Sequence, residues 1–156
     1  MKDKFKEIRE DVMDEQKAIE EAIERMLKLR SDFDPDKEDY SIEPAMGVYL
    51  MNFYNGIENI IKRVSKAYYL TIPKGESWHK ELLQLSFNPP DKKIPLFTKE
   101  IVANLHSYLS FRHRFTSGYG FQLKGEKMID LIDNTKPLWE EIKNTLSRFW
   151  ARVEGK

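Results

Sequence analysis

Apolar residues recur at spacings of three and four along most of this chain, and that period is the strongest constraint on its fold. Residues 3–31 show it most clearly. The apolar positions there include Phe5, Ile8, Val12, Ile19, Ala22 and Met26. Glu and Lys residues four apart fill the opposite face and support a helix. Residues 31–36 read Ser-Asp-Phe-Asp-Pro-Asp, which is typical of a turn. A long amphipathic helix is therefore expected over residues 3–31.

The same period continues in four more segments. The helices expected from it span residues 41–70, 77–85, 98–118 and 124–153. Ser41 and Thr98 are placed to cap the helices that follow them. Gly118 and Gly120 end the fourth helix, and Pro137 is expected to kink the last one without ending it.

No strand-like alternation persists anywhere in the 156 residues. Long helices joined by short turns favour antiparallel neighbours. The expected fold is an all-α, antiparallel up-down bundle of four to five helices, in a single domain over residues 1–156, which is long enough to bury a core.

Composition narrows the class of protein further. Lys plus Arg equals Asp plus Glu, with 26 residues each, so any RNA contact must come from a local basic patch. There is no cysteine, no long apolar run and no leader-like start, and we expect a cytoplasmic protein without a membrane span. No HExxH, Walker or dinucleotide-binding motif occurs, so no metal and no cofactor are expected.

The helix expected over residues 41–70 is apolar on most sides and polar along one narrow stripe. The stripe consists of Asn52, Asn55, Asn59, Arg63 and Lys66. Two interpretations remain open. The stripe is either a thin solvated edge of a buried helix or the wall of a functional site or dimer seam.

Residues 111–120 carry the most unusual chemistry, because two arginines and a histidine lie among aromatic residues where a helix ends. Arg112 precedes His113, and Ser117 follows His113 by one helical turn. Tyr119 stands between two glycines. One interpretation is structural, since basic side chains suit a helix C-terminus and pack on aromatic rings. The other is an RNA-directed site.

Three segments carry a resemblance that spans nearly the whole chain. They are residues 52–60, 75–83 and 108–120. Together they resemble the HEPN superfamily and, within it, the HepT-like ribonuclease toxins. The signature of that family is an Arg with a polar neighbour, a His five positions after the Arg, and a Tyr two positions later. Arg112, His113 and Tyr119 match it, but Ser117 stands where the family has its His.

The resemblance implies a metal-independent endoribonuclease that cleaves RNA through its own 2′-hydroxyl. Arg112 and Arg114 would bind the RNA phosphates, and an imidazole would act as the general base. Ser117 has no such group, which leaves two accounts. Either His113 takes over the base role from the preceding turn, or this chain binds RNA or a partner without cleaving.

The resemblance also implies partners. These are a second copy of the chain, so that two Arg112 side chains face each other in a cleft, and a minimal nucleotidyltransferase antitoxin encoded alongside in a prokaryotic toxin–antitoxin module. Such antitoxins add AMP to the motif Tyr, which here is Tyr119. The alternative is a non-catalytic HEPN binding subunit of a nucleotidyltransferase, and a helical scaffold without a site is the third option.

Four further residues are expected to have a structural or supporting role. Glu58 and Asn59 are candidates to support Arg112, and His106 is a candidate to approach the cleft. Trp78 is expected to pack the short helix.

Overall fold

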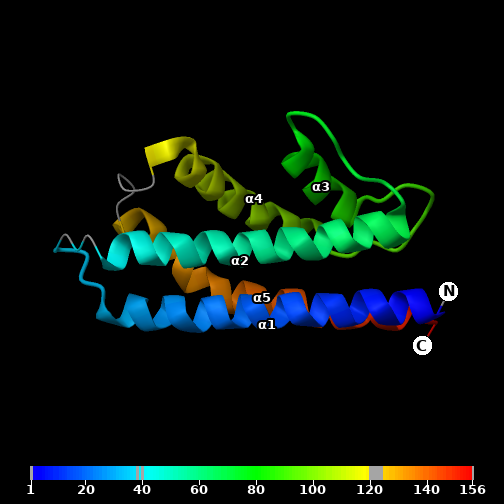
Figure 1. The fold of residues 1–156 in the computed structure, drawn as a ribbon, viewed down its shortest axis with the longest axis horizontal. Helices are drawn as coiled ribbons and strands as arrows, with labels where there is room; N and C mark the ends of the chain where they lie inside the picture. The colour runs from blue at the N-terminus through cyan, green and yellow to red at the C-terminus, as the bar shows by residue number, and fades with distance from the viewer. Residues whose placement is uncertain (1, 38, 40, 120–124, 156) are drawn as a thin grey trace.

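Five α-helices run back and forth through the described part of the chain (Figure 1). A computed structural model describes residues 2–37, 39, 41–119 and 125–155. The helices are α1 (Lys2–Asp32), α2 (Ile42–Val64), α3 (Trp78–Phe87), α4 (Lys99–Arg114) and α5 (Gly125–Val153). No strand occurs among these residues. The predicted all-α bundle is therefore confirmed.

Helix α2 is the central element and lies between α1 and α4, with α5 behind it (Figure 1). Eleven of its 23 residues are buried, because its apolar residues cover all but one stripe. Gly56 permits the close approach of α1, since a Cβ at this position would lie only 2.4 Å from Cγ1 of Ile19. A glycine in the middle of a helix costs stability on its own, so this contact gives it a packing reason.

The buried apolar side chains form one continuous cluster with members from all five helices. Trp139 and Trp150 belong to this core and are almost completely buried. In α5 the side chain of Ile132 is buried, whereas those of Leu131 and Val153 are only half-buried. In the described part, no helix is long and apolar enough to cross a membrane.

The N-terminal cap predicted for α4 is present, whereas the one predicted for α2 is not. Thr98 caps α4, because its hydroxyl accepts a hydrogen bond from the Ile101 N–H at 3.2 Å. Ser41 makes no such bond, and the prediction for it was wrong. Instead Asp39 accepts hydrogen bonds from the Ser41 N–H (2.9 Å) and the Ile42 N–H (3.0 Å). The Ser41 hydroxyl also donates to this carboxylate and lowers its pKa.

The two helices that carry the candidate site both end in a π-helical turn. Turn η1 (Ser65–Tyr69) continues α2, and turn η2 (Phe115–Tyr119) continues α4. Wider turns of this kind are rare and occur often at functional sites. Gly118 lies within η2, whereas Gly120 lies outside the described residues. Helix α5 passes through Pro137 without ending, as predicted.

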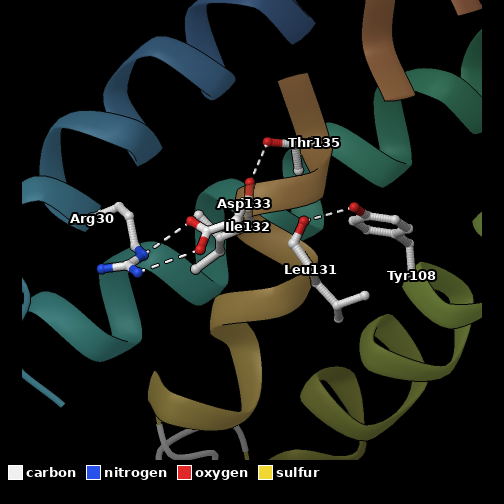
Figure 2. A network of polar contacts seen from close by, with 6 residues as sticks. All are labelled: Arg30, Tyr108, Leu131, Ile132, Asp133 and Thr135. Carbon is white, nitrogen blue, oxygen red and sulfur yellow. Dashed lines mark hydrogen bonds and ion pairs between the residues drawn. The ribbon is translucent and has the colours of Figure 1, made fainter. Parts of the chain in front are cut away.

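Polar contacts join α5 to both α4 and α1 (Figure 2). The Tyr108 hydroxyl donates to the Leu131 carbonyl at 2.6 Å. On the far side of α5, Arg30 of α1 pairs with Asp133 at 3.0 Å (Figure 2). Tyr108 is buried, and burial raises the pKa of its hydroxyl well above the usual range, so it remains a donor. This anchor sets the rotation of α4 one turn before Arg112.

Candidate functional site

Arg112 is held from the side by the central helix. Its Nε donates a hydrogen bond of 2.7 Å to Oδ1 of Asn55, which belongs to the polar stripe of α2. Within the described part, this is the one hydrogen bond that the guanidinium makes. The Arg112 residue is partly exposed. A guanidinium presents its donors in a planar fork that suits bidentate binding of a phosphate.

The residue that supports Arg112 differs from those expected. Glu58 and Asn59 were the candidates, but the contact comes from Asn55, one turn earlier. Glu58 turns toward α3, and Asn59 lines a groove beside α1. The polar stripe contained the correct residue. The rotation of α4 relative to α2 decides which residue of the stripe meets Arg112. It depends on long-range packing and could not be predicted from local sequence patterns.

The Tyr54 hydroxyl interacts electrostatically with two charged side chains, those of Glu58 and Arg112. This hydroxyl is buried and makes no well-formed hydrogen bond among the described residues, although Glu58 lies nearby. Burial raises its pKa well above the usual range and Glu58 raises it further, whereas Arg112 acts in the opposite direction. A buried polar group without a partner costs about 1–3 kcal/mol, and such groups merit a functional explanation.

Glu58 and His79 form a buried pair that connects α2 to α3. The His79 Nδ1 lies 2.8 Å from Oε2 of Glu58, whose side chain is 3% exposed. The imidazole also stacks on Trp78, with ring centroids 3.5 Å apart. The Lys62 ammonium lies 4.4 Å above the Trp78 ring. Trp78 therefore packs the start of α3, as expected, and in doing so holds His79.

A cavity between α3 and α4 gathers all three histidines of the chain. Its volume is about 650 Å³. The lining residues are Glu76, Ser77, His79, Lys80, His106, Leu109, Ser110, His113 and Arg114. His106 therefore shares this cavity with His113. Arg112 does not line it, because its side chain turns toward α2. The adjacent residues Arg112 and His113 thus serve two faces of α4.

The end of α4 is tied to its own backbone. The Ser117 hydroxyl donates to the Arg114 carbonyl at 3.0 Å, and the Thr116 hydroxyl donates to the Arg112 carbonyl at 2.9 Å. These bonds satisfy carbonyl groups that a helix end leaves open. Arg112, His113 and Arg114 form the last turn, where positive charge suits the helix dipole. The Tyr119 side chain, a candidate for modification, lies outside the described residues.

The polar stripe of α2 borders a groove against α1 of about 360 Å³. Asn52, Asn55 and Asn59 line it. Farther along, Arg63 pairs with Asp11 and Glu15 of α1, each at 3.5 Å. The two parts of the stripe therefore have different surroundings. One end is a solvated edge with ion pairs, and the other end contacts Arg112 through Asn55.

No group of three or more His, Asp or Glu side chains in the described part is arranged to hold a metal ion. The cavity histidines therefore do not form a metal site with their described neighbours. The arrangement suits the binding of phosphate and the transfer of protons instead.

Comparison with known proteins agrees with this reading of the fold. A family model described as a HepT-like protein matches residues 45–153, well over half of the chain. The match places the chain in the HEPN superfamily of helical bundles. Within that superfamily, the chain belongs to the HepT-like family. Searches of curated proteins and of solved structures gave no match. The three segments that carry the resemblance all lie inside the matched range.

Proposed function

We propose that this protein is a metal-independent ribonuclease of a prokaryotic toxin–antitoxin module. The observation that carries the proposal is the Arg112–Asn55 hydrogen bond of 2.7 Å. It fixes the guanidinium through Nε and leaves its two-pronged end for an RNA phosphate. Membership of the HepT-like family supports this, since that family is generally one of toxin-type ribonucleases.

The reaction needs a cation for the phosphate and an imidazole for the proton. In this proposal Arg112 and Arg114 bind the RNA backbone. His113 takes part in proton transfer from the α3–α4 cavity that it lines. Ser117 has no acid–base role here, since its hydroxyl is bonded to the Arg114 carbonyl. It stabilises the end of the helix that carries Arg112.

Two partners belong to the proposal. A second copy of the chain would face the first across Arg112, doubling the local positive charge of a chain with zero net charge. Sedimentation of the purified protein at the monomer mass would contradict this. A nucleotidyltransferase antitoxin would add AMP to Tyr119, and the added phosphate would repel the RNA backbone. Mass spectrometry after co-expression with that enzyme tests it, and an unmodified Tyr119 would contradict it.

A second candidate function is a binding subunit that no longer cleaves. The observation in its favour is the state of Ser117, which occupies the position of the family histidine and is exposed. Loss of a general base typically costs on the order of 10²–10⁴-fold in rate. A chain without a substitute for that group would retain RNA or partner binding alone.

The experiment compares the native chain, Arg112→Ala and Arg9→Ala on single-stranded RNA in EDTA. Arg9 is a matched control, because its ion pair with Glu154 is a surface contact remote from Asn55. We expect Arg112→Ala to lower both RNA affinity and cleavage at least tenfold, and Arg9→Ala to change neither. Cleavage by Arg112→Ala at the native rate would contradict the proposal. Binding without cleavage by the native chain would favour the second candidate.

A further inference from the structure

The α3–α4 cavity has the size and charge of a nucleotide site. Its volume of about 650 Å³ lies in the usual range for small-ligand pockets. Lys80 and Arg114 line it with only one carboxylate, Glu76, against them. The three imidazoles add groups that can donate or accept hydrogen bonds. The cavity thus favours an anionic ligand such as a phosphate with an attached base.

His79 differs from the other two histidines of this cavity, because a buried carboxylate holds it. The 2.8 Å contact with Oε2 of Glu58 suits donation from Nδ1, because a carboxylate oxygen is an acceptor. In that tautomer Nε2 keeps its lone pair and can accept a proton. A carboxylate that fixes the tautomer and orientation of a histidine is how hydrolases prepare a general base.

One turn of α2 positions both parts of the site. Asn55 holds Arg112, and Glu58, three residues later, holds His79. Asn55 and Glu58 are three residues apart and therefore lie on neighbouring positions of one face of α2. On α4, His113 follows Arg112 directly and lines the same cavity as His79. Helix α2 thus positions Arg112 and His79, and the cavity brings His79 and His113 together.

We propose that this cavity receives the nucleotide at the cleavage point of a single-stranded RNA, and that His79 is its general base. The inference rests on the proposed ribonuclease function and names the group that replaces the histidine absent at Ser117. Glu58 is a positioning residue, because it acts through His79.

The step balances as an intramolecular transesterification. The 2′-hydroxyl proton passes to Nε2 of His79 while the 2′-oxygen bonds to phosphorus. The bond from phosphorus to the 5′-oxygen breaks, its electron pair stays on that oxygen, and protonated His113 supplies the proton. The products are a 2′,3′-cyclic phosphate and a 5′-hydroxyl. Proton exchange with water restores both imidazoles.

The test uses His79→Asn, with Asn104→Ala as the control. An Asn amide can donate to Glu58 in place of Nδ1, so the buried carboxylate keeps a partner while Nε2 is lost. Asn104 is an exposed residue of α4 that bonds to the Glu100 carbonyl and does not line the cavity. We expect His79→Asn to reduce cleavage on the order of 10²–10⁴-fold with unchanged RNA affinity, and Asn104→Ala to have little effect. Added imidazole should restore part of the activity of His79→Ala.

Imidazole nitrogen NMR provides a second readout, and the chain has only three histidines to assign. In the native protein, His79 should be protonated at Nδ1, and Glu58→Gln should change that tautomer signature. An RNA with a deoxynucleotide at the cleavage point cannot be cleaved. Titrating it into the protein should shift the His79 and His113 signals, with the same dissociation constant as fluorescence anisotropy gives. Inorganic phosphate alone tests whether the nucleotide is needed; shifts as strong with phosphate as with RNA would overturn the nucleotide assignment.

The outcomes separate this inference from the proposed function. Full cleavage by His79→Asn, or RNA binding that leaves the His79 signal unmoved, overturns the inference and leaves the ribonuclease intact. RNA binding without cleavage by the native chain overturns the base role and leaves a binding protein. No RNA binding and no cleavage by the native chain overturns both.

Discussion

Arg112 and His113 are neighbours in the sequence, but their side chains serve different faces of α4. Arg112 contacts Asn55 of α2, and His113 lines the cavity beside α3. The sequence identified both residues as a candidate site because basic and aromatic residues cluster there. It placed Asn55 in the polar stripe and named Glu58, but it did not predict the Asn55–Arg112 contact or the Glu58–His79 pair. These contacts join residues 57 and 21 positions apart, and local spacing carries no information about them.

At this scale, Asn55→Asp tests the role of the Arg112 contact. The new carboxylate would keep an acceptor for Nε and add a full negative charge that competes with the RNA phosphate. We expect RNA affinity to fall about tenfold or more, since hydrogen bonds between charged groups are worth about 1.5–3 kcal/mol. Fluorescence anisotropy with a labelled single-stranded RNA measures the change.

Asn59→Asp is the control for that substitution. Asn59 lies one turn farther along the same stripe and lines the α1–α2 groove. The Asn59→Asp substitution adds the same negative charge at a residue that does not contact Arg112. An equal loss of affinity in both variants would mean that general charge repulsion, and not the Arg112 contact, explains the effect.

The helices themselves follow closely from the sequence, and their ends follow less well. The spacing of apolar residues predicted all five helices, because burial of one apolar face dominates the stability of helices in proteins. The π-helical turn η2 was not foreseen. There the Phe115 ring seats against Gly47 of α2, where a Cβ would lie 2.7 Å from Cε2 of the ring. Such a fit depends on a distant helix, which a local pattern does not encode.

At the scale of elements, Gly56→Ala tests the close approach of α1 and α2. Alanine favours a helix over glycine by about 1 kcal/mol, but its Cβ would overlap the buried Ile19 side chain. Overpacking typically costs about 1–3 kcal/mol, so we expect a net loss in the free energy of unfolding. Urea denaturation followed by circular dichroism measures it.

The Ile19→Ala background provides the matching control. It removes Cγ1 and Cδ1, the two atoms that a Cβ at Gly56 would approach most closely. In that background Gly56→Ala should become neutral or stabilising by about 0.5–1 kcal/mol. The same loss in both backgrounds would show that the contact with Ile19 is not what requires glycine.

At the scale of the whole molecule, three segments that are distant in the sequence assemble around one turn of α2. Residues 52–60, 75–83 and 108–119 are joined by the Asn55–Arg112 and Glu58–His79 contacts. The chain has zero net charge, yet Lys80 and Arg114 both line the α3–α4 cavity. The proposed RNA binding relies on such local positive charge, since the overall charge does not supply it.

The most direct measurement is the chemistry of the RNA ends produced by the native chain in EDTA. Transesterification by Arg112 and the cavity histidines predicts a 2′,3′-cyclic phosphate on one fragment and a 5′-hydroxyl on the other, identified by mass spectrometry. Their formation without a divalent metal would establish the central claim. Fragments with 5′-phosphate ends, or intact RNA after prolonged incubation, would contradict it.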